Sequence, residues 1–454
     1  MRQFWANAIQ NLPALSFQRR WVISVASALR RILVFNMSKQ TNEPEDFAVL
    51  SDKVRAFTEQ SHYYHSGEPI VYQNEWELSK DKPTVVELFC GLGGTTIGFE
   101  MAGFQTILGL DIHKPSIDTF RKSHPAAVSI LGDIRTVLSL DGHNSSSILT
   151  KMVKQQLGGR RLDVLVAGIP CQGFSITNRK RNEFDERNYL FYYFLEAAKC
   201  LKPNVVMIEN VSGLKSLSNG KFAKTIEHFL EYDAGYSAHH QVLNAGNYGV
   251  PQNRRRVVFL GAEGSLIDFP KAADDHILTV RDAISDLPKL GSGESANKYN
   301  REDSGLSEYA KLMKGSCTTL FNHEAPKHLT GTIKRIDSTK QGESIYRNFK
   351  QRIRLSWNSP SPTLVSGGIR PQFQFGHPSQ ARGETVRERA RIQSIPDWVD
   401  IQGGMVQGRV QTGNAVPPLL AKALALNIKR YLNNSCSGYG SAQRPLPTIS
   451  SRTQ

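Results

Sequence analysis

A cysteine stands directly after a proline, where an apolar run ends. The run at 162–168 leads through Ile169 and Pro170 to Cys171. The proline ring fixes the backbone before the cysteine, and a thiolate at the end of a strand can act as a nucleophile. A buried structural thiol is the commoner role of cysteine. The stretch by itself therefore leaves catalytic and structural interpretations open.

A carboxylate closes another apolar run. Glu209 follows the apolar residues at 205–208. A charged side chain at the end of a buried strand is costly unless it is paired or functional. The alternative is that Glu209 caps the next helix. Because Glu209 and Cys171 both follow strands, we expect them at the same edge of a sheet.

Three consecutive arginines open a later apolar run. Arg254, Arg255 and Arg256 precede the apolar residues at 257–262. The alternation of side chains along a strand sends Arg254 and Arg256 to one face and Arg255 to the other. The alternative to a functional role for these arginines is a solvated basic edge, which is common for such runs.

A glycine-rich turn follows the first strong apolar run. Gly91, Gly93 and Gly94 let the backbone approach a ligand closely. The dinucleotide fingerprint G-x-G-x-x-G would need glycine at position 96, where Thr96 stands. This departure disfavours a pyrophosphate. A nucleoside with a cationic sulfonium and an amino-acid tail needs no phosphate cradle. A tight turn without a ligand is the alternative.

Two acidic residues follow the next two apolar runs. Asp111 comes eighteen residues after Gly93, where a carboxylate can accept both ribose hydroxyls in nucleotide-binding α/β folds. Asp133, in the sequence LGDI, can accept a hydrogen bond from an adenine amino group. Either residue alone is more often a helix cap. The glycine turn and both acids in series predict a nucleoside site.

The elements that position these residues follow from the hydropathy pattern. Short apolar runs alternate with helical patterns, which predicts a parallel sheet covered by helices on both faces. We expect strands at 84–89, 104–110, 126–131, 162–168, 204–210 and 256–262, and helices at 95–103, 114–124, 188–201, 384–395 and 416–432. No apolar run reaches the 18 residues of a membrane helix.

The composition predicts a nucleic-acid partner and a reducing environment. The 454 residues carry a net charge of +15, which suggests an anionic partner, although a basic protein without one is the alternative. The five cysteines are scattered without a C-x-x-C spacing, which argues against disulfides and a zinc site, so we expect no metal. Cys171 is then a free thiol.

The chain divides into segments of different composition. Residues 1–42 lack acids and carry six of the net charges, which resembles a targeting peptide or an extension upstream of a start at Met37, and we favour the latter. Residues 43–83 form a lead-in and 84–270 a catalytic and cofactor-binding domain. The polar residues 271–383 predict a separate domain of short strands and loops. Residues 384–432 return to the large domain, and 433–454 have a disordered composition.

Seven motifs together resemble the DNA cytosine-5 methyltransferases of bacterial restriction–modification systems. In order they are FCGLGG (89–94), PCQGFS (170–175), ENV (209–211), QNRRR (252–256), PSPTLVSGG (360–368), RERARIQSIPD (387–397) and GNAVPP (413–418). The resemblance implies the α/β fold of class I S-adenosylmethionine-dependent methyltransferases, a Rossmann-like mixed sheet, with 271–383 as target-recognition domain. Asp111 departs from the family, which often has glutamate there, and Cys90 occupies a small-residue position.

The resemblance also implies a mechanism. Cys171 adds as a thiolate to carbon 6 of cytosine, which turns carbon 5 into a nucleophile. A protonated Glu209 neutralises charge at ring nitrogen 3. Arg254 is predicted to hold the cytosine carbonyl, and Arg256 to lie near the base and its phosphates. The methyl donor is S-adenosyl-L-methionine.

Further residues receive roles by the same resemblance. The predicted cofactor site comprises Phe89 beside the adenine, the turn of Gly91, Gly93 and Gly94, Asp111 at the ribose, Asp133 at the adenine amine, Pro170, and Asn414 closing the site. The predicted DNA contacts are Gln172, Ser175, Arg179, Lys180 and Arg181 after the nucleophile, with Arg370 and Gln372 as base readers, for which a plain surface loop is an equal alternative.

The implied substrate is duplex DNA with the target base flipped out. We expect a monomer on DNA, in the cytoplasm at the nucleoid, and a separately acting restriction endonuclease. A tRNA cytosine-5 methyltransferase and a non-catalytic DNA-binding relative are the alternatives. A nucleotide-dependent oxidoreductase is disfavoured by Thr96.

Overall fold

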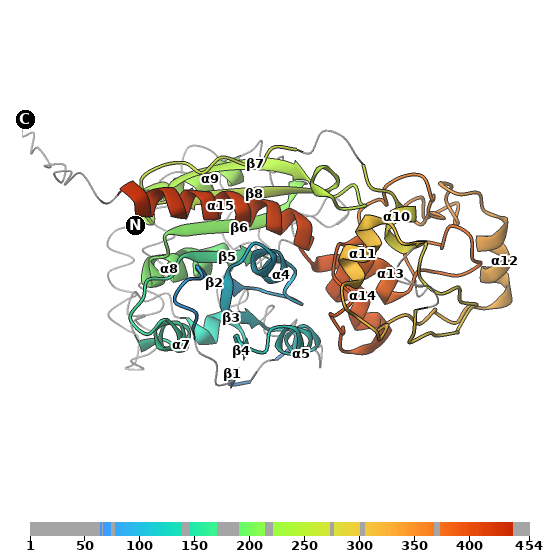
Figure 1. The fold of residues 1–454 in the computed structure, drawn as a ribbon, viewed down its shortest axis with the longest axis horizontal. Helices are drawn as coiled ribbons and strands as arrows, with labels where there is room; N and C mark the ends of the chain where they lie inside the picture. Colours follow the sequence, from blue (N-terminus) through green and yellow to red (C-terminus); the bar gives the residue numbers. More distant parts are fainter. Residues whose placement is uncertain are drawn as a thin grey trace, which may run out of the picture.

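The computed structural model describes residues 64–65, 67–73, 78–138, 146–169, 190–213, 221–272, 277–299, 305–366 and 373–438. Figure 1 shows a large part, built on a sheet with helices on both faces, and a smaller irregular part beside it. Among the residues in these ranges, no helix has the length and apolar character that a membrane crossing requires.

The described residues form an eight-stranded sheet in the order β1-β4-β3-β2-β5-β6-β8-β7. Its strands are β1 (Ile70–Tyr72), β2 (Thr84–Leu88), β3 (Gln105–Asp111), β4 (Val128–Leu131), β5 (Val164–Gly168), β6 (Val205–Val211), β7 (Ser237–Asn244) and β8 (Arg255–Ala262). Each of the six strands predicted from the sequence is present, with its bounds shifted by at most two residues.

The sheet is mixed rather than wholly parallel. The central strands β4, β3, β2, β5 and β6 are parallel to one another. The strands β1, β8 and β7 pair antiparallel with their neighbours. The polar pattern of β7 (SAHHQVLN) hid it from sequence analysis, because an edge strand does not need two apolar faces.

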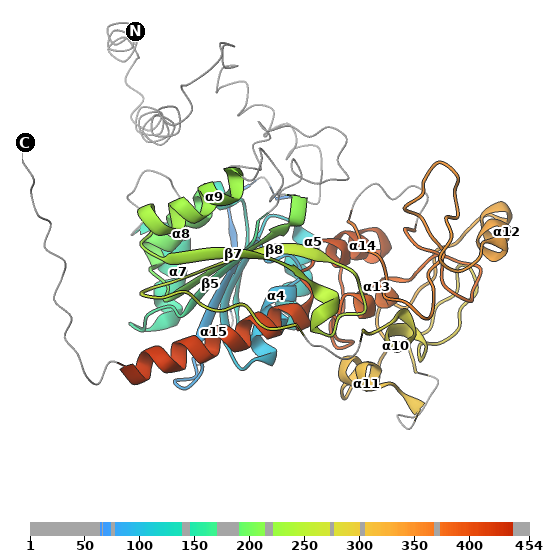
Figure 2. The same cartoon turned by 90° about the horizontal axis from the view of Figure 1, so that it is seen from above.

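Helices cover both faces of the sheet. They are α4 (Gly94–Met101), α5 (Lys114–Ser123), α6 (Ile134–Val137), α7 (Ile148–Leu157), α8 (Leu190–Leu201), α9 (Lys221–His228) and α15 (Pro418–Gly438). Figure 2 shows α7, α8 and α9 on one face and α4 with α15 on the other. The two faces bury separate apolar clusters, one around Phe194 and Leu165 and the other around Phe99 and Leu424.

The C-terminal helix returns to the start of the sheet, as predicted. It packs along α4, where two glycines permit the approach. A β-carbon on Gly94 would lie 2.3 Å from the carbonyl oxygen of Val416, and one on Gly98 would lie 2.4 Å from that of Pro418. Such contacts are too short for any side chain, so the GNAVPP segment lies directly on the helix that follows the glycine turn.

The smaller part contains short helices and isolated β-bridges. Its helices are α10 (Val280–Ile284), α11 (Glu308–Lys314) and α12 (Thr330–Ser338), followed by α13 (Val386–Ile392) and α14 (Gly404–Asn414). The prediction of short strands at 271–383 is wrong for the described residues, where the β-structure consists of single bridges. Most loop segments of this part run without regular pairing.

Buried ion pairs stabilise the region where the two parts meet. Arg391 contacts Asp397 at 2.6 Å and Asp286 at 3.2 Å, and Arg382 contacts Glu388 at 2.6 Å. Burial raises the pKa of Glu388, but the adjacent Arg382 outweighs this effect and holds that pKa below its usual range. These pairs hold segments together where the sequence offers few apolar residues.

Helix α13 belongs to both parts of the molecule. Its Ile392 packs in the apolar cluster of the small part with Leu355 and Phe375, whereas its Val386 and Ala390 pack against Ile97 of α4. Residues 384–414 therefore connect the two parts, and only the segment from α15 onward lies wholly on the sheet.

Candidate active site

The predicted site residues of the large part lie at the carboxyl edge of the parallel strands. Phe89 follows β2, Asp111 ends β3, Asp133 follows β4 and Glu209 lies near the end of β6. Carboxyl ends of parallel strands meet at one edge, which is where open α/β sheets bind ligands. The structure thus brings together side chains from four strands that are up to 120 residues apart in the sequence.

The glycine turn after β2 has an unusual backbone. Phe89 has φ 57°, Gly91 φ 55° and Gly93 φ 91°, and a non-glycine residue in this left-handed region carries strain. A β-carbon on Gly93 would lie 2.6 Å from Nε2 of His124, whose Nδ1 lies 3.0 Å from Glu100. Glycine is therefore required at 93 both by backbone conformation and by the histidine packed against it.

Thr96, which breaks the dinucleotide fingerprint, has a specific partner. Its backbone N–H donates to Oε2 of Glu87 at 3.0 Å, and its hydroxyl donates to the same oxygen. Glu87 is 2% exposed, and burial raises its pKa to about 7 although these hydrogen bonds lower it. Glu87 was not among the predicted site residues, although it lies within an apolar strand, which is the same signal that indicated Glu209.

Asp111 ties the glycine turn to the end of β3. Its carboxylate accepts the backbone N–H of Gly91 at 2.8 Å and that of His113 at 2.8 Å. Burial raises the pKa of Asp111, against the effect of the backbone hydrogen bonds and of His113. Each carboxylate oxygen has a second lone pair, so Asp111 retains acceptor capacity for hydroxyl groups of a ligand.

Asp133 caps the short helix α6. It accepts the backbone N–H of Arg135 at 2.9 Å and also pairs with the guanidinium of Arg135. The alternative considered from the sequence, a helix cap, therefore describes its contacts in this structure. An adenine amine at this position would share the carboxylate with Arg135.

Glu209 and Arg256 form an ion pair at the ends of β6 and β8. The Nε of Arg256 lies 3.0 Å from Oε1 of Glu209, and the Glu209 residue is 8% exposed. The backbone of β6 pairs Glu209 with Gly168 of β5, and a β-carbon on Gly168 would lie 3.9 Å from Oε2 of Glu209. The carboxylate thus lies above the last residue of β5, three positions before Cys171.

The end of β5 is fastened by a second residue of the ENV motif. The side-chain amide of Asn210 donates to the carbonyl of Ile169 at 3.3 Å. This bond holds the strand end from which Pro170 and Cys171 follow. Lying outside the described residues are Pro170, Cys171, Gln172, Ser175, Arg179, Lys180, Arg181, Arg370 and Gln372.

Arg254 does not face the site in the way we predicted. It is 1% exposed, and its guanidinium donates to the carbonyl oxygens of Leu364 at 2.9 Å, Gly413 at 2.9 Å and Ala415 at 3.0 Å. Arg255 is exposed, so the predicted alternation of the three arginines is confirmed. The guanidinium of Arg254 therefore lies inside the protein. Arg256 replaces it as the candidate for the contact with a base carbonyl that we predicted for Arg254.

Gln252 also links the segment before β8 to the small part. Its side-chain amide donates to Oε1 of Gln393, and its Oε1 accepts the N–H of Leu364 at 3.0 Å. The motifs around 252, 364, 393 and 413 are therefore bonded to one another. Asn414, at the end of α14, is exposed, whereas the methyl group of Val416 would lie 3.9 Å from a β-carbon on Gly168.

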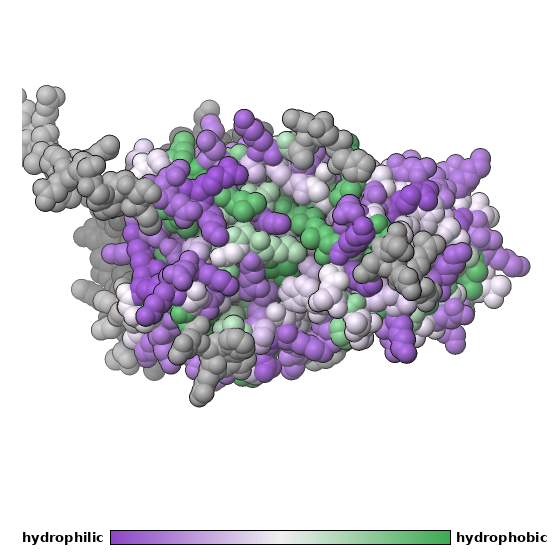
Figure 3. Space-filling model, viewed as in Figure 1, coloured by the Kyte–Doolittle hydropathy of each residue, from purple (hydrophilic) through white to green (hydrophobic). Residues whose placement is uncertain are grey.

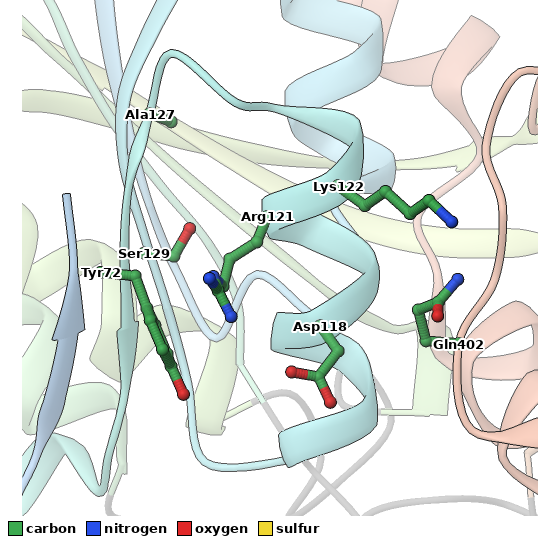
Figure 4. Close-up of a pocket in the computed structure, with 7 residues that line it drawn as sticks. All are labelled: Tyr72, Asp118, Arg121, Lys122, Ala127, Ser129 and Gln402. Atoms are coloured by element: carbon green, nitrogen blue, oxygen red, sulfur yellow. The ribbon is translucent and has the colours of Figure 1, made fainter. Parts of the chain in front are cut away.

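A separate pocket of about 330 Å³ lies beside α5. Figure 4 shows the side chains around it, which come from β1, α5, β4 with the residue before it, and the segment before α14. Arg121 lies 3.6 Å from the centre of the Tyr72 ring, and Lys122 pairs with Asp400. The lining residues are Tyr72, Asp118, Arg121, Lys122, Ala127, Ser129 and Gln402, none of which is a predicted site residue.

Comparison with known proteins identifies relatives along most of the chain. The model of the family described as C-5 cytosine-specific DNA methylase matches residues 83–430. The type II methyltransferase M1.HphI of Haemophilus parahaemolyticus is 34% identical over 355 residues, covering 75% of this chain and 85% of that protein. The type II methyltransferase M.DdeI of Desulfomicrobium norvegicum is 32% identical, covering 77% and 89%.

Solved structures share the fold. A protein encoded within an Escherichia coli prophage, solved as a candidate DNA modification methyltransferase, superposes with a TM-score of 0.62 at 23% identity, covering 78% of this chain and 100% of that chain. The Dnmt2 methyltransferase of S. pombe gives a TM-score of 0.50 at 14% identity, covering 78% of this chain and 100% of that chain.

Glu87 provides a prediction about stability and pH. With a pKa of about 7 when folded and 4.5 as the ordinary value, the folded protein binds more protons than the unfolded chain between these pH values. Its free energy of unfolding should therefore fall as pH rises through that window. Glu87→Gln, which cannot ionise, should remove this fall, so the stability of the variant relative to wild type should rise by about 3 kcal/mol between pH 4.5 and 8.

Urea unfolding of the full chain at pH 5, 6, 7 and 8 measures this difference. The exposed Glu231 supplies a matched control, since Glu231→Gln should track the wild type at each pH. An unchanged difference between Glu87→Gln and wild type across the series would contradict the assignment of a protonated Glu87.

Proposed function

Since this chain belongs to the C-5 cytosine-specific DNA methylase family, we propose how its residues carry out the reaction of that family. The resemblance predicted from the seven motifs is confirmed, and so is the class I S-adenosylmethionine-dependent methyltransferase fold. The protein is a DNA cytosine-5 methyltransferase, and its methyl donor is S-adenosyl-L-methionine. The remaining steps are our proposal.

Cys171 is the proposed nucleophile. Its thiolate forms a bond to carbon 6 of cytosine, and the electron pair of the 5,6 double bond becomes available at carbon 5. After methylation a water molecule takes the proton from carbon 5, its electron pair restores the 5,6 double bond, and the bond between sulfur and carbon 6 breaks with the thiolate as leaving group. The single observation that supports this placement is the Glu209–Arg256 pair above Gly168, three residues before Cys171.

Glu209 and Arg256 are proposed to bind the ring that Cys171 attacks. Glu209 and ring nitrogen 3 of the base share one proton, which neutralises the negative charge that develops there on addition of the thiolate. Arg256 donates to the adjacent carbonyl oxygen, because its guanidinium already lies beside the carboxylate of Glu209. One acid and one fixed cation at neighbouring ring atoms orient the base and stabilise the adduct.

The cofactor fits the edge formed by β2, β3 and β4. The position of a β-carbon on Gly91 meets nothing within 4 Å, so a ligand can approach the backbone of the turn. We propose that Asp111 binds the ribose, Phe89 the adenine ring, and Asp133 the adenine amine, which donates to the carboxylate beside the guanidinium of Arg135. Gly93, Gly94, Pro170 and Asn414 are proposed to surround the rest of the cofactor. When bound there, S-adenosylmethionine supplies an electrophilic methyl group to carbon 5.

The DNA substrate has to present a flipped base. Carbon 6 of a stacked cytosine is out of reach of a side chain, and extrusion of one base costs a few kcal/mol. We propose that Gln172, Ser175, Arg179, Lys180 and Arg181 bind the DNA around the flipped base, and that Arg370 and Gln372 contribute to base reading. The biological role we propose is protection of host DNA from a separate restriction endonuclease, as the type II relatives suggest.

Parallel methyl-transfer assays test this proposal. Purified protein with labelled S-adenosylmethionine should label unmodified plasmid DNA, and leave tRNA and protein unlabelled. Bisulfite sequencing should then map the product to cytosines of one short sequence. Cys171→Ser should retain affinity for DNA and lose turnover by several orders of magnitude. Near-normal turnover in that variant, or label on tRNA in place of DNA, would reject the proposal.

Substitutions of Arg254 and Arg256 should separate stability from catalysis. Arg254→Ala leaves the carbonyls of Leu364 and Gly413 unpaired, and at about 1–3 kcal/mol for each group the free energy of unfolding should fall by roughly 3 kcal/mol. Arg256→Ala should keep the melting temperature within a few degrees and lower kcat by roughly 100-fold or more. Thermal melts and single-turnover rates at 20 °C measure both effects. A large loss of kcat in Arg254→Ala with normal stability, together with a loss of stability in Arg256→Ala, would instead identify Arg254 as the residue that contacts the base.

A further inference from the structure

A basic segment lies at the end of the small part, far from the proposed catalytic site. We name residues 327–354 the distal arm. It comprises α12 and the loop that follows, and in both Figure 1 and Figure 2 α12 lies at the end of the molecule away from the sheet. Hydrophilic side chains cover much of this end in the space-filling view (Figure 3).

The positive charge of the small part is concentrated in this arm. Residues 327–354 contain eight lysines and arginines against two acids, whereas residues 271–326 and 355–383 together contain nine of each. Cations and acids are balanced in the rest of the small part, so the excess of cations in this one segment is not explained by general solubility. It indicates an anionic partner at the arm.

Most of these cations are exposed and free of ion pairs. Six of them are exposed, and within the part of the chain that the structure describes none of the six is within ion-pair distance of a carboxylate. They are Lys327, Lys334, Arg335, Lys340, Arg347 and Lys350. Elsewhere in the small part the buried Arg382, Arg389 and Arg391 each pair with an acid.

The arm has an ordered framework. Arg354 is 9% exposed and donates to the carbonyls of Asp337 at 2.8 Å and Thr339 at 2.9 Å, which fastens the end of α12 to the loop. Beneath it, Ile336 and Ile345 pack together. Exposed cations on a framework that is already ordered lose little conformational entropy on binding an extended polyanion.

Aromatic rings lie between the cations. The guanidinium of Arg335 lies 4.9 Å from the ring centre of Tyr346, and that of Arg352 lies 5.2 Å from the ring of Phe349. Phe349 is 48% exposed. Arg352 is buried, so of these two guanidinium groups the exposed Arg335, held beside the Tyr346 ring, is the one available to a phosphate.

We propose that the distal arm binds the phosphate backbone of duplex DNA outside the methylated sequence. The proposal rests on the proposed function only in taking DNA as substrate. The arm then lengthens the bound stretch of DNA and raises affinity without reading bases, because contacts to phosphate carry little sequence information. If the arm binds phosphates, affinity should increase with the length of the duplex and decrease with salt concentration.

Matched lysine variants test the arm. Lys334→Gln, Lys340→Gln and Lys350→Gln are combined in one protein, and Lys151→Gln, Lys154→Gln and Lys199→Gln in a control of the same net charge. The control lysines are exposed on α7 and α8, on a sheet face away from the small part (Figure 1). Thermal melts verify that both variants are folded, and fluorescence anisotropy measures their affinity for duplexes carrying the mapped methylation site.

On a long duplex of about 40 base pairs the arm variant should bind roughly tenfold more weakly at 100 mM salt, and the slope of log affinity against log salt should fall by about 2 to 3. On a duplex of about 14 base pairs, and for the control variant on either duplex, the change should stay within about twofold.

Three results would overturn the proposal. They are equal losses in the arm and control variants, an unchanged affinity of the arm variant for the long duplex, and a loss confined to single-stranded RNA of the same length. Any of these would leave methylation of plasmid DNA by the wild type intact. Failure of the proposed function would instead appear as absence of that methylation.

Discussion

The guanidinium of Arg254 is buried at the meeting point of segments that are far apart in the sequence. It donates to the carbonyls of Leu364 in the small part, of Gly413 in the last turn of α14, and of Ala415 directly after α14. Burial lowers the pKa of Arg254, with the nearby Arg256 acting in the same direction and Glu209 opposing them. A cation in such a place is tolerated only where carbonyl dipoles and a nearby carboxylate replace water.

The geometry of the site follows from that connection. Arg256 lies two residues further along the same strand face, so fixing Arg254 also fixes the cation that pairs with Glu209. The bonds of Gln252 to Gln393 and Leu364 act in the same direction. Motifs separated by more than 150 residues therefore form one rigid support, and a base bound at Glu209 meets groups already in position.

The residues at strand ends are predictable from the sequence because the ends of parallel strands obey a simple rule. Asp111, Asp133 and Glu209 each follow an apolar run, and parallel strands bring such positions to one edge. It could not assign Arg254, because the role of an arginine depends on which carbonyls surround it, and those come from residues 110 to 161 positions away. The hydrogen bonds from Thr96 to Glu87 could not be predicted either, because they depend on how α4 packs against β2.

The small part was the least predictable region. Its segments are held by buried pairs such as Arg391–Asp397, not by an apolar periodicity that a sequence displays. The polar helix α14, with three glycines in eleven residues, likewise gives no amphipathic signal. The prediction of short strands there took a scarcity of helical patterns as a sign of β-structure, whereas the described chain is mostly loop supported by ion pairs.

The central claim is that sulfur of Cys171 bonds to carbon 6 of a flipped cytosine, and trapping with a fluorinated substrate tests it most directly. A duplex carrying 5-fluorocytosine at the mapped site is incubated with protein and S-adenosylmethionine and then denatured. Because the fluorine at carbon 5 cannot leave as the proton does, the sulfur–carbon bond should persist. The account predicts a denaturant-resistant, one-to-one complex with wild type and none with Cys171→Ser. Absence of the complex from wild-type protein that methylates ordinary cytosine, or its formation by Cys171→Ser, would contradict it.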